Sequence, residues 1–120
     1  MRDPRLQKLA SVLVNYSCGV KKGQLVRISG SPSAQPLIVE LFREVLAAGA
    51  HPTVRMVPDE LDEIFLKNAS DEQLRFLNPI SLYEYEKIDV SIGIWAEENT
   101  EALTNCDRSE EHTSELQSRL

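Results

Sequence analysis

Few side chains in this sequence have the types and spacing that metal binding or nucleophilic catalysis requires. The chain has two histidines, His51 and His112, and no HExxH motif, so a zinc site rich in imidazole ligands cannot be assembled. His51 precedes Pro52 at the entry of an expected strand, where a structural role is the simpler interpretation. Ser31 and Cys18 lack a convincing histidine partner and no G-x-S-x-G motif is present, so a hydrolytic triad is not indicated.

Residues 30–33, Gly-Ser-Pro-Ser, lie between an expected strand and an expected helix. Backbone N–H groups at such a helix start can hold a phosphate or another anion. The sequence has neither G-x-G-x-x-G nor the lysine-bearing phosphate loop. An ordinary strand-to-helix turn with a serine N-cap therefore explains this segment more simply.

A second polar segment, residues 96–100 (AEENT), follows the last expected strand. If the strand order is 2-1-3, this segment faces residues 30–33 at the switch point where open parallel sheets bind ligands. Element order alone thus predicts a cleft lined by Ser31, Glu97, Glu98 and Asn99. Adjacent carboxylates at a strand end point in different directions, so the two glutamates by themselves do not indicate a metal site.

Hydrophobic periodicity predicts the elements that would position this cleft. Short loops and intervening helices favour parallel strands with right-handed crossovers. We therefore expect an α/β fold, a partial parallel sheet of three strands with flanking helices. The expected strands are residues 25–29, 53–57 and 90–95, and the expected helices are residues 4–17, 34–48, 59–68, 70–77 and 79–87. The expected inward side chains include Leu37, Ile38, Leu41, Phe42, Val45 and Leu46, and also Leu61, Ile64, Phe65 and Leu66.

Length and composition indicate one globular domain. The chain has 120 residues, of which 42% are hydrophobic and 27% charged. A net charge of −6 disfavours nucleic-acid binding. No apolar run approaches the ~18–20 residues of a membrane span, and the N-terminus lacks a signal-like apolar stretch, so we expect a cytoplasmic protein without a membrane partner. Cys18 and Cys106 show no CxxC spacing, and we expect two free thiols.

Residues 1–107 resemble one known family. The segments YSCGVKKGQLV, AAGAHP and AEENTEAL, in this order and spacing, resemble the start of the thermophilic-type metallo-aminopeptidases, the aminopeptidase T and aminopeptidase S group, which is called PepS in some bacteria. The resemblance implies a two-domain, homodimeric enzyme that removes N-terminal residues from peptide substrates with two divalent metal ions, such as zinc or cobalt. Members of this family are much longer than this chain.

The resemblance also implies that the metal ligands and the catalytic carboxylate lie in a C-terminal domain with no counterpart here. We therefore assign no catalytic, cofactor-binding or metal-binding residue to this chain. We expect it to be an N-terminal fragment that binds no metal ion and is inactive alone. A two-metal site needs several carboxylates and imidazoles around ions ~3.5–4 Å apart, and residues 1–107 contain one histidine, His51.

The resemblance ends after Asp107. Residues 108–118 (RSEEHTSELQS) resemble the in-frame translation of a common sequencing-library adapter. We interpret residues 108–120 as a non-native tail on an incomplete N-terminal α/β domain, residues 1–107, so that His112 has no functional role. A parallel sheet normally has both faces covered, and an uncovered edge invites association, so residues 1–107 alone are expected to be marginally stable.

The alternative hypothesis is a complete, small ligand-binding module of flavodoxin-like or receiver-like type. A receiver requires acidic residues after its first strand and a phosphorylatable aspartate after its third. This sequence has Ser-Gly-Ser at residues 29–31 and Ala-Glu at residues 96–97 in those places, which counts against the receiver.

Overall fold

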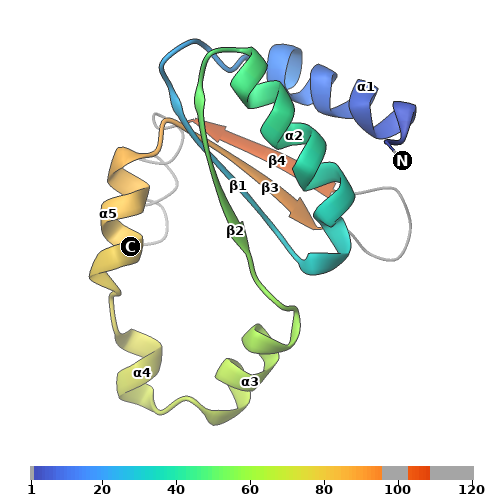
Figure 1. Cartoon of the computed structure of the whole chain (residues 1–120). Helices are drawn as coiled ribbons and strands as arrows, with labels where there is room; N and C mark the ends of the chain where they lie inside the picture. The colour runs from blue at the N-terminus through green and yellow to red at the C-terminus, as the bar shows by residue number, and fades with distance from the viewer. Residues whose placement is uncertain (1, 96–102, 109–120) are drawn as a thin grey trace.

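The computed structural model describes residues 2–95 and 103–108 and shows an α/β fold (Figure 1). A π-helical turn (Leu13–Ser17) follows α1, and a 3-10 turn (Pro32–Ala34) precedes α2. The helices are α1 (Pro4–Val12), α2 (Gln35–Ala47), α3 (Glu60–Asn68), α4 (Asp71–Arg75) and α5 (Pro79–Lys87). The strands are β1 (Leu25–Gly30), β2 (His51–Met56), β3 (Val90–Trp95) and β4 (Leu103–Arg108).

The strands form one sheet in the order β2-β1-β3-β4. Strand β1 is parallel to both β2 and β3, and Arg27 lies between Thr53 and Ser91 in the register. The predicted three-stranded parallel sheet is therefore confirmed, and its strands have the 2-1-3 order that the predicted cleft requires. The sequence pattern did not predict β4, which pairs with β3 in the antiparallel direction. Because the chain turns back after β3, Arg108 lies opposite Val90.

Local capping signals explain where the helices begin. The carboxylate of Asp3 accepts the N–H of Arg5 at 2.9 Å, and Pro4 occupies the first helical position of α1. Ser70 and Gln73 form a capping box at the start of α4, with each side chain bonded to the backbone N–H of the other residue. Both helix starts were predicted from the sequence.

The hydrophobic core lies between the sheet and the pair of helices α1 and α2, which pack against each other on one face (Figure 1). Leu37, Ile38, Leu41 and Val45 are buried, as predicted from their helical spacing. The same prediction is wrong for Phe42 and Leu46, which are exposed because the broad apolar face of α2 is wider than the surface that covers it. The core also contains Ala10, Val14, Val26, Ile28, Val90, Ile92 and Ile94.

Helices α3, α4 and α5 form an arc, residues 60–87, and α3 and α4 stand away from the sheet (Figure 1). None of these helices contains a buried residue. The prediction that Leu61, Ile64, Phe65 and Leu66 point into the core is therefore wrong, since all four are exposed. The pattern correctly predicted an amphipathic helix, but no described element covers its apolar side.

Candidate functional site

The predicted cleft is only partly within the described residues. Ser31 lies just after β1, at the carboxyl end of the parallel strands, and is 8% exposed. It occupies the N-cap position of the 3-10 turn, but its hydroxyl is 2.7 Å from the hydroxyl of Ser33 and makes no capping bond. Glu97, Glu98 and Asn99 lie outside the described residues, so their place in the cleft stays a prediction.

The carboxyl ends of β1 and β3 approach each other closely beside this turn. Gly30 pairs with Ile94 in the register, and a Cβ added at Gly30 would lie 3.1 Å from the carbonyl oxygen of Ile94. A side chain at this position would require a shift of a few tenths of an ångström from its neighbours. Gly30 therefore fits closely against β3 at the point where the predicted cleft begins.

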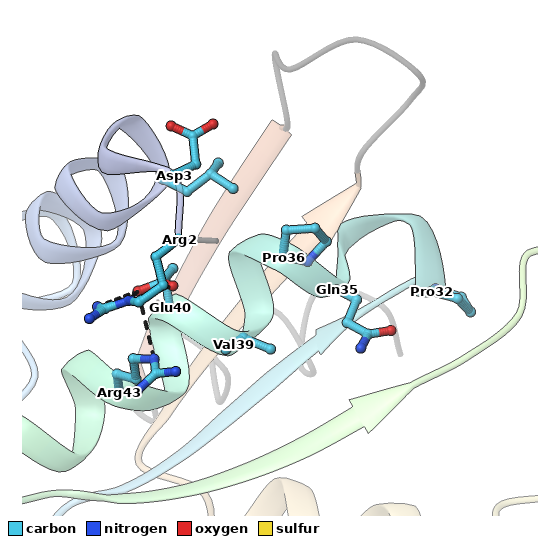
Figure 2. A pocket seen from close by; sticks show the side chains of 9 residues that line it. Arg2, Asp3, Pro32, Gln35, Pro36, Val39, Glu40 and Arg43 are labelled. Carbon is cyan, nitrogen blue, oxygen red and sulfur yellow. Dashed lines mark hydrogen bonds and ion pairs between the residues drawn. The ribbon is translucent and has the colours of Figure 1, made fainter.

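A pocket of about 490 Å³ lies at the N-terminal ends of α1 and α2 (Figure 2). The side chain of Glu40 is 6% exposed and accepts hydrogen bonds from Arg2, at 2.7 Å from Nη2 and 3.2 Å from Nε. Arg43 lies 3.9 Å from the same carboxylate. The lining residues are Arg2, Asp3, Leu6, Pro32, Gln35, Pro36, Val39, Glu40 and Arg43.

The carboxylate of Glu40 in this pocket is paired with the guanidinium groups of Arg2 and Arg43. The hydrogen bonds from Arg2 hold the pKa of Glu40 below its ordinary value, and the same contact raises the pKa of Arg2. The contact joins Arg2, which directly precedes the N-cap of α1, to Glu40 of α2. The sequence reasoning missed this pair. A sequence feature that could have indicated it is Glu40, a charged residue directly before Leu41 of the core.

The sheet face opposite α2 carries a polar cluster that contacts α5. Arg27 donates to the hydroxyl of Ser91 at 3.3 Å and lies 3.5 Å from the carboxylate of Glu84. Arg55 lies 4.0 Å from the same carboxylate. The Nε atom of Arg27 is buried without a hydrogen-bond partner among the described residues. This cluster connects β1, β2 and β3 to α5.

The described residues do not fit the metal centre that the resemblance implies. Within residues 2–95 and 103–108, no three His, Cys, Asp or Glu side chains are grouped so that they could hold a metal ion. His51 is exposed at the start of β2, and its backbone N–H bonds to the carbonyl oxygen of Gln24 at 2.8 Å. The described side chains therefore do not form the metal centre of such an enzyme.

The two cysteines correct a further expectation. Cys18, which is fully buried, and Cys106 of β4 form a disulfide, with Cα atoms 5.6 Å apart. The prediction of two free thiols is therefore wrong. It rested on sequence spacing, whereas β4 brings Cys106 opposite Ile92, next to the core. In the part of the chain that the structure describes, no helix has the length and apolar character needed to cross a bilayer.

Comparison with known proteins identifies a family and a similar solved structure. Residues 2–119 match a family model described as thermophilic metalloprotease (M29). The matched range includes residues 108–119, so it does not mark a boundary at Asp107. The solved structure of wild-type AmpT from Thermus thermophilus matches with 30% sequence identity and a TM-score of 0.53. The match covers 66% of this chain and 20% of that chain, and no curated protein sequence matches.

Proposed function

Because the chain belongs to the M29 family of thermophilic metalloproteases, we propose that it is the N-terminal part of a longer, metal-dependent aminopeptidase. The observation that carries this proposal is the family match over residues 2–119, together with the structural match to one fifth of the AmpT chain. The complete enzyme removes N-terminal residues from peptides. Its two divalent ions, zinc, cobalt or similar, are bound by residues that follow the described part.

In this proposal residues 1–107 are an incomplete domain and residues 108–120 are a non-native tail. The arc of α3, α4 and α5 supports the first statement, because its apolar side chains have no described element to cover them. The resemblance of RSEEHTSELQS to a translated sequencing-library adapter supports the second. The complete enzyme is cytoplasmic and acts as a homodimer.

In this proposal residues 1–107 serve the enzyme as scaffold and cavity wall. Ser31, with Glu97, Glu98 and Asn99, lines the approach to the substrate at the carboxyl ends of β1 and β3. Their proposed role is access and positioning, because the resemblance implies that the metal ligands lie in a C-terminal domain. The fragment alone is inactive.

The proposal is tested first on DNA and then on protein. A long read of the source DNA across codon 107 should show the reading frame continuing into a second domain with several carboxylates and histidines. The complete protein should release the chromophore from a leucine anilide, and a metal chelator should abolish the release. The 120-residue chain should release none under the same conditions.

Two results would contradict the proposal. Metal-dependent release by the pure 120-residue chain would show that the fragment carries its own active site. A genome that encodes residues 108–120 and then a stop codon would reduce the family match to ancestry. In that case saturable binding of ATP, FMN or NAD would favour a flavodoxin-like module.

A further inference from the structure

The disulfide between Cys18 and Cys106 connects an edge strand of the described sheet to the N-terminal part of the chain. Cys18 directly follows the π-helical turn, and its backbone N–H bonds to the carbonyl oxygen of Leu13 at 2.8 Å. Cys106 lies within β4, opposite Ile92 of β3. The bond therefore fastens β4 to the segment that joins α1 to β1.

Strand β4 has fewer neighbours than the strands at the centre of the sheet. Among the strands that the structure describes, β4 pairs with β3 alone, whereas β1 lies between β2 and β3. If the bond between the sulfur atoms breaks, β4 keeps its antiparallel ladder with β3 and the packing of Cys106 against the core. The order of β4 should therefore respond to the state of the bond more than the order of any other described strand.

The two cysteines differ in their access to solvent. Cys18 is fully buried in the same core cluster as Ala10 and Val14. Cys106 is only partly buried and packs against that cluster from the side of β4. Thiol–disulfide exchange requires access to one of the two sulfur atoms, and exposed disulfides are more readily reduced than enclosed ones. A reagent from solvent therefore approaches the bond at Cys106.

The reduced form of the pair is compatible with the rest of the fold. A neutral thiol at Cys18 behaves as a small apolar side chain, so reduction leaves neither a cavity nor a charge in the core. Helix α2 packs on β1 and β2, and none of these three elements contains a cysteine. The same chain can therefore keep its core both with β4 held by the bond and with β4 released from it.

We propose that Cys18 and Cys106 form a redox-operated clasp, which holds β4 on the sheet when oxidised and leaves β4 to its ladder with β3 when reduced. The reductant is a dithiol, and the oxidant is a small-molecule disulfide. The inference does not rest on the proposed function, because both states belong to the described chain. It goes beyond that function, which assigns neither cysteine a role.

The exchange balances in bonds, electrons and protons. A thiolate of the dithiol attacks Sγ of Cys106, the bond between the two cysteines breaks, and Cys18 leaves as a thiolate that takes a proton. The second sulfur of the dithiol then displaces Cys106, which takes the second proton, and the reagent becomes a cyclic disulfide. The protein gains two thiols and the reagent is oxidised by two electrons. A small-molecule disulfide reverses these steps.

The test compares amide hydrogen exchange of the 120-residue chain in dithiothreitol and in oxidised glutathione, with the thiols counted by alkylation and mass spectrometry. Reduction should accelerate exchange in β4 at least about tenfold and change exchange in β1 and α2 by less than about twofold. Replacing dithiothreitol with excess oxidised glutathione should restore the slow exchange of β4. This reversal distinguishes a clasp from irreversible damage to the fold.

Two variants separate the bond from the surrounding packing. Cys106→Ala should show fast exchange in β4 under both conditions, because the clasp cannot close. The matched control is Ser17→Ala, at the exposed residue next to Cys18, which should keep the full redox response of the wild type. If Cys106→Ala does not fold, the comparison of oxidised and reduced wild type decides the question without it.

Four results would overturn the clasp. Free thiols at both cysteines in excess oxidised glutathione would show that the bond does not form in solution. A bond that survives excess dithiothreitol in the folded chain would be an inert crosslink. Equal acceleration of exchange in β1, α2 and β4 would show that the bond supports the whole fold, and unchanged exchange in β4 would show that the strand does not depend on it. None of these measurements involves peptide hydrolysis, so their outcome is independent of the proposed function.

Discussion

The sheet with α1 and α2 and the arc of α3, α4 and α5 differ in what covers their apolar side chains. Leu41 of α2 is fully buried, whereas Leu66 of α3 is 72% exposed, although both lie in amphipathic helices. The difference shows that helix formation follows local signals, while burial requires a second surface at the right place. One region has that surface within the described chain, and the other does not.

The largest expected difference between the two regions is in the free energy of unfolding after one leucine is truncated in each. Leu41→Ala should lower the free energy of unfolding by about 2–5 kcal/mol, because it leaves a cavity in the core. Leu66→Ala should change it by less than about 0.5 kcal/mol, because the side chain already contacts solvent. Urea denaturation followed by circular dichroism measures both. A loss of similar size in the two variants would show that the arc is packed in the isolated chain.

A smaller effect is expected from removing one helix cap in each region. Asp3→Ala and Ser70→Ala each remove a side-chain acceptor worth about 1 kcal/mol. Asp3→Ala should lower the global free energy of unfolding, because α1 packs against α2. Ser70→Ala should instead accelerate hydrogen exchange within α4 and leave global unfolding unchanged. If the global free energy of unfolding falls equally in both variants, α4 is coupled to the core, and the two regions do not differ in packing as described.

The smallest effect is expected from the ion pairs. Arg2 holds the pKa of Glu40 below its ordinary value, so this pair stabilises the fold above the unfolded-state pKa, and the stabilisation is lost as pH falls through the lower folded-state pKa. Stability should decline as the pH is lowered from about 6 to about 3, and Glu40→Gln should make this decline shallower.

The corresponding ion pair in the arc joins Glu63 and Lys67, whose charged atoms lie 2.9 Å apart and whose side chains are both exposed to solvent. Glu63→Gln should leave the pH dependence of global unfolding unchanged, because an exposed pair contributes little and the arc does not take part in global packing. Thermal melts of the two variants and the wild type over the same pH range measure the difference. Identical pH profiles for Glu40→Gln and the wild type would contradict the assigned role of Arg2.

The sequence predicted most of the local structure. The short connections predicted parallel strands, and Asp3 and Ser70 correctly predicted two helix starts, because these features depend on neighbouring residues. The exposure of Leu61 and Phe65 could not be predicted, since periodicity identifies an apolar side but not its partner. The disulfide joins residues 88 positions apart, a contact that local patterns do not contain. The β4 strand, which pairs with the preceding strand β3, was also not predicted.

The candidate site was predicted only in part for the same reason. Ser31 lies after β1 as expected, because its position follows from strand order alone. The pairing of its hydroxyl with Ser33 was missed, since a capping bond and a side-chain pair have the same sequence signature. The contact of Arg2 with Glu40 joins residues 38 positions apart and also escaped the local patterns.

The position of β1 between β2 and β3 has a consequence for the order in which the chain folds. β1, α2 and β2 are consecutive, so they can assemble over a short loop as soon as residue 56 is available. Pairing of β1 with β3 instead joins residues such as Arg27 and Ser91, 64 positions apart, and waits for the whole arc to be synthesised. Doubling a loop of this kind costs only about 0.6 kcal/mol of closure entropy. We therefore expect the β1–α2–β2 unit to form before β3 joins the sheet, and we expect a longer connection between β2 and β3 to add little closure entropy.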